Sequence, residues 1–488
     1  MIPIIYRLRQ SIRFETRGSS FLVISEVPLN VVRASKRAVG VLQLCDGKRT
    51  LQQIARDTGI LGEEQVFRIC DYFNRRAVLE TAVAENQGYF PSVTVIIPTR
   101  DRAEVLAECL ESVFLQDYPS DRMELIVIDD GSKDETGILV SARPCRLFTN
   151  PESRGQSYCR NLGAQHARGE ILAFLDSDCV AGRLWLRDLV TCFQWEKIGA
   201  VGGYVDSYLN QSMLDRYERN LSPLNLGKYV LLGTNNRSGF YMPGCSLLVR
   251  KEAFFEIGGI RETLHLGEDV DFCWRMRKAG WHALYVPSGA VRHRHRDTLA
   301  AMLRRRADYG TSEAVLYRLH PEREKIFPIR PLAAASFLGM CLGVVYPSFL
   351  ACIPAAACFL VEAVAKALRI RRIHARISAK RAFFSVARVY MSSFYLMAFY
   401  LVRFYFLAML LAGFVFHSLW FLCFFLLMLA SLVDYSAKTP QLPFPVFLLY
   451  YTLDQISYQI GVFAGCLRAK SFRSYLPRFV GHLPDEAL

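Results

Sequence analysis

The sequence contains no closely spaced pair of cysteines and no matching cluster of cysteine and histidine. Its 14 cysteines are scattered singly along 488 residues. This spacing argues against a zinc site and is typical of thiols in a reducing compartment. Residues 1–10 also lack the long apolar core and small-residue cleavage site of a signal peptide. We therefore expect the hydrophilic part of the protein to lie in the cytosol.

Charged residues are scarce in the last third of the chain. Up to about Pro321 the composition is that of a soluble protein, whereas beyond about Pro331 it is mostly Leu, Phe, Ala, Val and Tyr. The length favours two or three units, with at least one of them in a membrane. The net charge of +14 raises the possibility of nucleic acid. Much of the basic excess lies beside apolar runs, however, so we expect anionic lipid headgroups and no nucleic acid.

The first 88 residues predict a small winged-helix-like domain. Polar and apolar residues alternate from Ile4 to Val27, on both sides of Arg17-Gly18, and this pattern predicts a β-hairpin. Apolar periodicity predicts amphipathic helices over residues 30–44, 50–58 and 62–77, with Thr50 as the N-cap of the second. Residues 78–83 are predicted to return as a strand. A winged helix most often binds DNA, but Glu63, Glu64 and Asp71 lie on the expected recognition surface. Peptide binding along an exposed strand edge fits better, and a structural appendage is the alternative.

This N-terminal segment resembles the PqqD-like domains. The pattern is carried by Leu42, Asp46-Gly47, Thr50, Ile54 and Ala55 and covers roughly residues 20 to 85. PqqD-like domains capture the leader peptides of ribosomally made natural products. The resemblance therefore implies a peptide partner.

From Ser92 the chain alternates strands and helices. Three apolar runs, Val93–Ile97, Leu125–Ile128 and Ile171–Leu175, each end in polar residues. This rhythm predicts a parallel sheet covered on both faces, which binds ligands outside the carboxyl ends of its strands. The polar residues at these ends are Pro98, Thr99, Asp101, Arg102, Asp129, Asp130, Asp176 and Asp178.

Asp176 and Asp178 follow the third run one residue apart. If the strand continues, its period of two sends both carboxylates to the same side. Two such oxygen donors hold Mg²⁺ or Mn²⁺ together with substrate phosphate oxygens. The alternative is a strand that ends in a solvated acidic turn.

The combination of these motifs resembles the family 2 glycosyltransferases. The residues that carry the resemblance are Val95–Thr99, Val127–Ser132, Gly155, Arg160–Gly163, Gly169-Glu170 and Asp176–Asp178. It covers about residues 90 to 320 and implies a GT-A fold, a Rossmann-like α/β nucleotide-diphospho-sugar transferase core. It also implies that Thr99 and Asp130 line a uracil pocket beside Asp101 and Arg102, that Asp176 contacts the ribose or sugar, and that Asp178 ligates the metal. Arg160 adds positive charge for the diphosphate.

A second acidic cluster, Gly267–Asp271, predicts the start of a helix. By the same resemblance Asp269 is the base that takes the proton of the acceptor hydroxyl. The helix N-terminus favours the ionised carboxylate. Glu268 either contacts substrate or caps and solvates the helix, and for Asp271 we prefer the capping role.

Val291–His295 follows a strand-like segment, and His293 and His295 share a face if the chain is extended. Related enzymes place a histidine nearby as a further metal or diphosphate contact, and either residue fits; a solvated basic loop is the alternative. Arg304–Arg306 then stands where polysaccharide synthases of the superfamily carry Gln-x-x-Arg-Trp. The missing Gln and Trp argue against a secreting synthase.

The C-terminal third predicts helices in or on a membrane. Leu332–Leu368 has the length of a helical hairpin interrupted by Pro347 and Pro354, and residues 389–414 and 416–433 predict two further spans. The basic segment 369–381 should face the cytosol. Arg403 is either snorkelling or paired, and residues 444–467 are polar enough to lie in the interface.

The domain order, residues 1–88 PqqD-like, 89–325 glycosyltransferase and 326–488 membrane-associated, resembles the mycofactocin-biosynthesis type of family 2 glycosyltransferase. It implies inverting transfer of glucose from UDP-glucose to premycofactocin, a peptide-derived redox cofactor. We expect a cytoplasmic catalytic domain attached to the cell membrane. The alternatives are a glycosyltransferase acting on a polyprenyl phosphate or glycolipid, and an inactive peptide carrier, which the four retained aspartates argue against.

Overall fold

The computed structural model describes residues 2–17, 20–59, 62–233, 240–323, 325–346, 348–372 and 377–480. Their packing forms two compact units. The first comprises the described residues of Met1–Arg7, Leu44–Phe67 and Glu80–Thr298. The second comprises the described residues of Leu8–Gln43, Arg68–Leu79 and Leu299–Leu488. The boundaries predicted at 88 and 325 concern independent folding and stay predictions.

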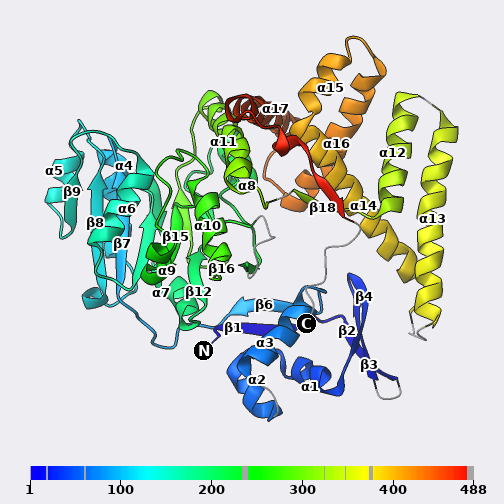
Figure 1. Cartoon of the computed structure of the whole chain (residues 1–488), viewed down its shortest axis with the longest axis horizontal. Coiled ribbons are helices and arrows are strands. Elements are labelled where there is room, and N and C mark those ends of the chain that lie inside the picture. The colour runs from blue at the N-terminus through cyan, green and yellow to red at the C-terminus, as the bar shows by residue number, and fades with distance from the viewer. Residues whose placement is uncertain are drawn as a thin grey trace. The chain divides into compact units, whose positions relative to one another are not determined.

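An eight-stranded sheet organises the first unit (Figure 1). In sheet order its strands are β14 (Leu231–Gly233), β16 (His282–Tyr285), β12 (Ile198–Gly202), β15 (Ser246–Arg250), β10 (Ile171–Leu175), β7 (Val93–Thr99), β8 (Met123–Asp129) and β9 (Arg146–Thr149). The three predicted apolar runs are β7, β8 and β10. Every residue of β7 and β10 is buried, as expected for strands covered on both faces.

The predicted parallel arrangement of the three apolar runs is confirmed, whereas the rest of the sheet is mixed. Strands β10, β7, β8 and β9 are parallel neighbours. Strand β15, however, runs antiparallel to both β10 and β12. Apolar composition marks a buried strand but carries no information about its direction, so the reversal at β15 was not visible in the sequence.

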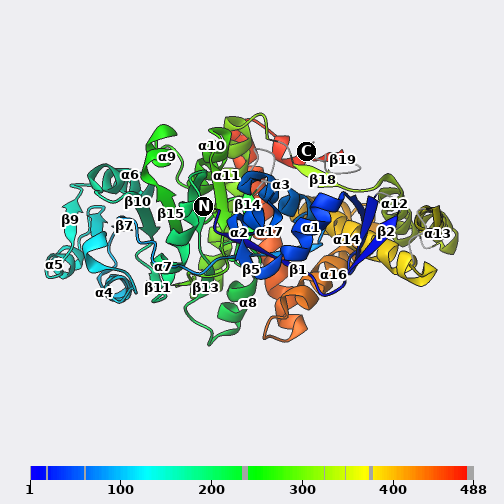
Figure 2. The same ribbon diagram turned by 90° about the horizontal axis from the view of Figure 1, so that it is seen from below.

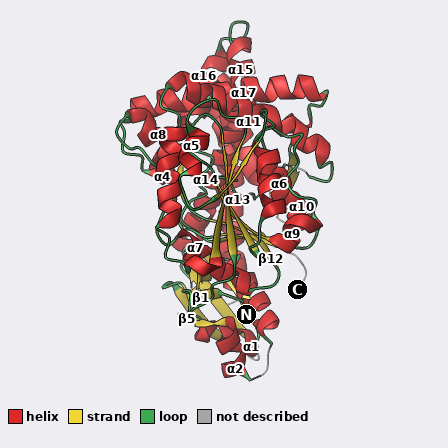
Figure 3. Ribbon diagram, turned by 90° about the vertical axis from the view of Figure 1, so that its left-hand side faces the viewer, coloured by secondary structure: helices red, strands yellow, loops and turns green. Residues whose placement is uncertain are grey.

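Helices cover both faces of this sheet, with α4 and α7 on one side and α6, α9 and α10 on the other (Figure 3). The helices of the unit around this sheet are α4 (Ala103–Phe114), α5 (Thr136–Ser141), α6 (Gln156–His166), α7 (Trp185–Val190), α8 (Met213–Leu221), α9 (Lys251–Glu256) and α10 (Glu268–Lys278), with 3₁₀ turns η1 (Ser120–Arg122) and η2 (Thr191–Gln194). Phe174, Phe254 and Phe272 fill the core under α6, α9 and α10. At Gly163 of α6 a Cβ would lie 2.4 Å from Ile96 Cγ2, so only glycine allows this helix to approach the sheet so closely.

A second, three-stranded sheet joins distant parts of the same unit. Its order is β11 (Cys179–Ala181), β17 (Val291–His293) and β13 (Val205–Ser207). Strand β17 pairs antiparallel with β11 and parallel with β13. It therefore brings the histidine segment alongside the residues that follow Asp178.

The N-terminal residues form two further three-stranded sheets. These are β5 (Asp46–Thr50), β1 (Ile4–Leu8) and β6 (Leu79–Val83), and then β2 (Ile12–Arg17), β3 (Ser20–Glu26) and β4 (Leu29–Ala34). The predicted hairpin is confirmed as β2 and β3, although Gly18 lies outside the described residues. The predicted capping by Thr50 is also confirmed, because Thr50 and Gln53 form a reciprocal capping box.

The N-terminal residues also form three helices, α1 (Lys36–Leu44), α2 (Leu51–Thr58) and α3 (Glu63–Asn74). The predicted helix over 30–44 is wrong in its first half, because residues 29–34 form β4. This strand pairs with β3 along its whole length, and its central Val31-Val32 suits a strand. The helix begins only after Ser35, whose Oγ accepts a hydrogen bond from the Ala38 N–H at 3.2 Å.

The C-terminal part of the second unit is helical. Its elements are α11 (Leu299–Leu319), α12 (Pro331–Val345), α13 (Phe349–Arg372), α14 (Ala379–Phe404), α15 (Phe406–Ala412), α16 (Ser418–Lys438) and α17 (Phe444–Ala469), the 3₁₀ turn η3 (Arg473–Tyr475), and the strand pair β18 (Ile326–Pro328) and β19 (Arg478–Val480). Within the described ranges, α14 and α16 are long and apolar enough to cross a membrane. Pro347 lies outside the described residues, and Pro354 lies inside α13. An interfacial position for residues 444–467 stays a prediction.

Helices α11 and α17 lie side by side (Figure 1, Figure 2). A buried ion pair joins them, with Arg306 Nε 3.0 Å from Asp454 Oδ2. Arg403 of α14 donates to Gln455 Oε1 at 2.9 Å and lies over the Tyr458 ring. Of the two predicted alternatives for Arg403, the paired arrangement is confirmed.

Candidate functional site

The loops after β7 and β8 are tied to each other. The Asp101 N–H donates to Ser132 Oγ at 2.9 Å, and the Lys133 N–H donates to Asp101 Oδ1 at 2.7 Å. Asp101 adopts a positive φ of 48°, which is uncommon for a residue with a side chain. Asp101 thus connects the loops that follow β7 and β8, and its other carboxylate oxygen lies 3.4 Å from Arg100 Nε.

Asp129 and Asp130 organise the backbone that follows β8. Asp129 Oδ1 accepts from the Ser132 N–H at 2.9 Å. Asp130 accepts four hydrogen bonds from the next loop along the sheet, from Asn150 Nδ2, Ser153 Oγ, Arg154 N–H and Gly155 N–H at 2.7–2.9 Å. Burial by itself would raise the pKa of Asp130, but these donors outweigh it and lower the pKa to about 2.

Thr99, by contrast, keeps a free polar atom. It is 4% exposed, and its Oγ1 has no hydrogen-bond partner. Its main chain is fixed, because the Asp130 N–H donates to the Thr99 carbonyl at 2.8 Å, and Pro98 pairs with Ile128 in the sheet. An unpaired buried hydroxyl costs free energy unless a ligand satisfies it, which fits the predicted donor pocket.

Arg160 joins two of the predicted site carboxylates. This side chain is 2% exposed, with Nη2 2.6 Å from Asp176 Oδ1 and Nη1 3.1 Å from Glu268 Oε1. Gln156 Nε2 also donates to Glu268 Oε1 at 2.7 Å. The Arg160 charge, predicted to face a diphosphate, is matched here by two carboxylates, so the residue holds the end of β10 to the start of α10.

Asp178 and Asp176 contact different residues. Strand β10 ends at Leu175, and the two aspartates occupy the turn before β11. The strand does not continue through the two aspartates, so its period of two does not set the directions of their side chains. Asp178 Oδ2 accepts from Arg102 Nη1 at 2.7 Å, and Asp178 Oδ1 lies 3.5 Å from His293 Nε2.

The surroundings of Asp178 favour its charge. Burial works to raise its pKa, but His293 and the guanidinium groups of Arg102 and Arg296 outweigh this, so the pKa lies below its ordinary value. Asp178 Oδ1 is buried and accepts no hydrogen bond. An ionised oxygen without a donor, beside an imidazole nitrogen, fits a divalent cation.

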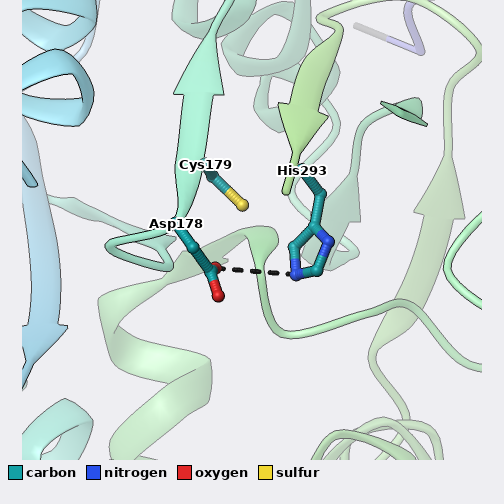
Figure 4. Close-up of side chains that lie close together, drawn as sticks. All are labelled: Asp178, Cys179 and His293. Atoms are coloured by element: carbon teal, nitrogen blue, oxygen red, sulfur yellow. Dashed lines mark ion pairs between the residues drawn. The ribbon is translucent and has the colours of Figure 1, made fainter. Parts of the chain in front are cut away.

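A third donor atom lies at this point. Oδ1 or Oδ2 of Asp178, Sγ of Cys179 and a ring nitrogen of His293 all lie within 4.8 Å of one another (Figure 4). His295 stands beside His293, with ring centroids 5.0 Å apart, but its Nδ1 lies 3.8 Å from Glu218 Oε2. Of the two predicted histidines, the structure brings His293 to Asp178.

Asp269, in the first turn of α10, lies in a different electrostatic environment. Its Oδ2 accepts from the Gly244 N–H at 3.3 Å. Burial and repulsion from Glu268 raise its pKa to about 7. The sequence predicted that the helix N-terminus would favour the ionised form, but desolvation and the neighbouring carboxylate outweigh that effect. The residue keeps some solvent access, as a group that exchanges protons requires.

Two further observations concern this helix. Asp271 is fully buried and pairs with Arg275 at 2.7 Å and Arg261 at 3.4 Å. The preferred role as a solvated helix cap is therefore wrong, because no side chain caps α10 and Asp271 instead forms buried ion pairs. Sequence reasoning missed Gly244 as a contact of Asp269. A Cβ at Gly244 would lie 3.2–3.3 Å from the Arg160 guanidinium, which explains the glycine in Met242-Pro-Gly-Cys.

Comparison with known proteins relates this chain to glycosyltransferases. The profile of the family described as "Glycosyl transferase family 2" matches residues 94–258. The "Pre-mycofactocin glycosyltransferase" of Mycobacterium tuberculosis is 29% identical over 342 residues, which cover 68% of this chain and 67% of that protein. The "Glucosyl-dolichyl phosphate glucuronosyltransferase" of Haloferax volcanii is 26% identical over 254 residues, covering 47% of this chain and 78% of that protein.

Among solved structures, the mannosyltransferase PcManGT from Pyrobaculum calidifontis in complex with GDP-Man and Mn²⁺ is 21% identical, with a TM-score of 0.38, over 64% of this chain and 88% of its own. The family profile covers the strands and loops that carry Thr99, Asp130, Asp176 and Asp178. Taken with the glycosyltransferases that match this sequence, it shows that the chain is a glycosyltransferase whose residues 94–258 match the family 2 profile.

Proposed function

We propose that the chain transfers glucose from UDP-glucose to premycofactocin, with inversion at the anomeric carbon, and builds a short β-glucan chain. The observation that carries the chemistry is Asp269, a carboxylate with partial solvent access whose pKa of about 7 suits a general base. It is connected to the strand-end residues, because its neighbour Glu268 shares Arg160 with Asp176.

The donor side of the site is supported by the strand ends of β7, β8 and β10. The unpaired Thr99 hydroxyl offers a hydrogen bond to a base edge. Asp101 and Asp130 fix the two loops around it. Asp176, partly exposed and held by Arg160 through one oxygen, keeps its second oxygen for the ribose or sugar hydroxyls.

The residues present fit a divalent cation, Mg²⁺ or Mn²⁺, held by Asp178 and His293. A cation bound there supplies positive charge against the departing diphosphate. Arg102 keeps Asp178 oriented by occupying Oδ2, which leaves Oδ1 for the cation.

Asp269 performs the proton transfer. As the acceptor hydroxyl oxygen forms its bond to the anomeric carbon, the bond from that carbon to the diphosphate oxygen breaks, and the hydroxyl proton passes to Asp269. Attack from the face opposite the leaving group gives inversion. A base with a pKa near the working pH is ionised often enough to accept the proton and basic enough to hold it.

The acceptor is supported by the relative from Mycobacterium tuberculosis, whose match extends over two thirds of this chain and so reaches beyond the family 2 profile. A polyprenyl phosphate or glycolipid acceptor is the second candidate. The Haloferax volcanii relative, named for glucosyl-dolichyl phosphate, favours it, as do the apolar helices α14 and α16.

One experiment separates these acceptors. Purified full-length protein in detergent is incubated with Mn²⁺ and either UDP-glucose, UDP-galactose or GDP-mannose, with premycofactocin or polyprenyl phosphate as acceptor, and the products are weighed by mass spectrometry. We expect hexose addition to premycofactocin from UDP-glucose, and none by Asp269→Asn. Transfer only to polyprenyl phosphate would replace the first proposal by the second.

We also propose that the chain is attached to the cell membrane through its C-terminal helices. We further propose that the N-terminal segment binds a peptide or peptide-derived acceptor along a strand edge. Binding raises the effective concentration of the acceptor. The precursor peptide should then raise the KM for premycofactocin without changing that for UDP-glucose. No competition would remove this role.

A further inference from the structure

Cys179 and His293 lie directly opposite each other on two neighbouring strands. It is the first residue of β11, and the antiparallel register pairs it with the last residue of β17. Directly paired residues of antiparallel strands point to the same face, with Cβ atoms about 4.5–5.5 Å apart. The backbone register, rather than a chance side-chain rotamer, therefore places this thiol beside the imidazole (Figure 4).

The spacing of the three donor atoms suits one cation. Bonds from a divalent transition metal are about 2.0–2.2 Å to nitrogen and carboxylate oxygen and about 2.3 Å to sulfur, so two ligands of one ion lie at most about 4.5 Å apart. The three atoms here lie within 4.8 Å of one another. The separation of 3.5 Å between Asp178 Oδ1 and His293 Nε2 already lies within this range, and a closer approach of the sulfur would complete the set of three ligands.

Asp178 Oδ1 accepts no hydrogen bond, whereas the Cys179 thiol has a side-chain hydrogen bond with Cys245, which metal binding would replace. Arg102 occupies Asp178 Oδ2 and not Oδ1. Cys179 is completely buried, and its neighbouring thiol is Cys245. A cysteine in such a place is ordinarily a small apolar core residue, but the core interpretation does not account for a bare carboxylate oxygen beside it.

We propose that Cys179 Sγ is a ligand of the cation held by Asp178 and His293, so that this centre selects thiophilic divalent cations over Mg²⁺. This inference rests on the proposed metal-dependent function and specifies its metal. On coordination the Sγ–H proton leaves to solvent and the sulfur binds as thiolate. Thiolate ligands favour Co²⁺, Zn²⁺ and Cd²⁺, whereas Mg²⁺ prefers oxygen ligands and retains its water.

The test is a titration of the full-length protein with Co²⁺ under reducing, anaerobic conditions, without sugar donor. A thiolate ligand gives an intense sulfur-to-cobalt charge-transfer band in the near ultraviolet. We expect this band at one equivalent of Co²⁺ in the wild type, its loss in Cys179→Ser and its retention in Cys245→Ser, the matched control. We also expect Cys179→Ser to weaken Cd²⁺ binding by about tenfold or more while changing Mg²⁺ binding by less than about twofold.

Absence of the band in the wild type would overturn the proposal, and this result does not depend on any variant folding. Equal loss in both serine variants would also overturn it, since it would assign the sulfur to the thiol pair. Because no sugar transfer is measured, the band can be present when the proposed acceptor is wrong. Conversely, transfer without the band would leave the glycosyltransferase proposal standing and remove Cys179 from the centre.

Discussion

Asp130, after β8, and Asp269, at the start of α10, are aspartates of the same unit whose surroundings act on the carboxylate in opposite directions. Four donors around Asp130 hold its pKa at about 2. Around Asp269, burial and Glu268 raise the pKa to about 7. The difference lies in the neighbours, because the side chain is the same.

The ionised form of Asp130 stabilises the folded chain, whereas the ionised form of Asp269 destabilises it. The Asp130 anion is held more favourably in the folded chain than in the unfolded one, and the Asp269 anion less favourably. Strongly raised carboxylate pKa values cluster where proton transfer is required. The lowered pKa at the end of β8 therefore suits a structural role, and the raised pKa at the start of α10 suits the proton transfer proposed for Asp269.

The largest expected effect comes from removing the reactive carboxylate. We expect Asp269→Asn to lower kcat by about 10³-fold while leaving the affinity for UDP-glucose nearly unchanged, because a general base acts only in the transition state. The same variant should be more stable than the wild type at pH 8, where the wild type carries the disfavoured anion. Kinetics, calorimetry and thermal unfolding measure the three quantities. A collapse of donor binding would move Asp269 to the donor site.

Next in size is Asp178→Asn, which we expect to lower kcat by about 10²-fold by weakening the positive charge that opposes the diphosphate. Binding of Mn²⁺, followed by its electron paramagnetic resonance signal, should weaken in parallel. Asp121→Asn is the control, because its side chain is 80% exposed and should leave both quantities within about twofold. Normal turnover by Asp178→Asn would exclude the metal assignment.

The pH dependence of the rate follows from the raised pKa. Asp269 must be ionised to accept a proton, so kcat should fall by about tenfold for each pH unit below 7 and level off above about pH 8. The lowered pKa of Asp178 keeps that residue ionised over this range, so it does not contribute to the fall. Rates measured from pH 5 to 9 check this, and a flat profile down to pH 5 would contradict the role of Asp269.

The smallest effect on rate, and the clearest on stability, should come from Asp130→Asn. An amide nitrogen cannot accept the bonds from Ser153 and Gly155, and we expect the free energy of unfolding at pH 7 to fall by ~2 kcal/mol. Because the folded pKa lies below the ordinary 3.8, this contribution is complete above pH 3.8 and disappears as the pH falls through about 2. Denaturation at pH 7 and pH 3 measures it. A loss of UDP-glucose affinity larger than the loss of stability would instead place Asp130 in the uracil pocket.

The sequence predicted those parts of the fold that depend on local patterns. Apolar runs located β7, β8 and β10, and Thr50 marked the start of α2. The reversal of β15 and the strand at residues 29–34 were missed, because strand direction and pairing are set by distant partners. Local propensity alone does not report them.

The same limit applies to the site. The positions of Asp178 and Asp269 within motifs are the basis of the roles proposed for them. The donors that saturate Asp130 come from the loop 150–155, about 20 residues downstream, and no motif indicated them. Cys179 and His293 are more than a hundred positions apart and meet only through the register of β11 and β17. The raised pKa of Asp269 likewise depends on burial that helix-end reasoning could not supply.

Arg160 pairs with both Asp176 and Glu268, which the proposed function places on the donor side and beside the base. If a donor sugar takes Asp176 from the guanidinium, the buried cation retains Glu268 as its partner, and the position of Glu268 sets the field at Asp269. Occupancy of the donor side then changes the affinity of the acceptor side, and reciprocity requires the acceptor to change donor affinity by the same factor. On the proposed function, Arg160 would therefore couple the binding of the two substrates within a single chain.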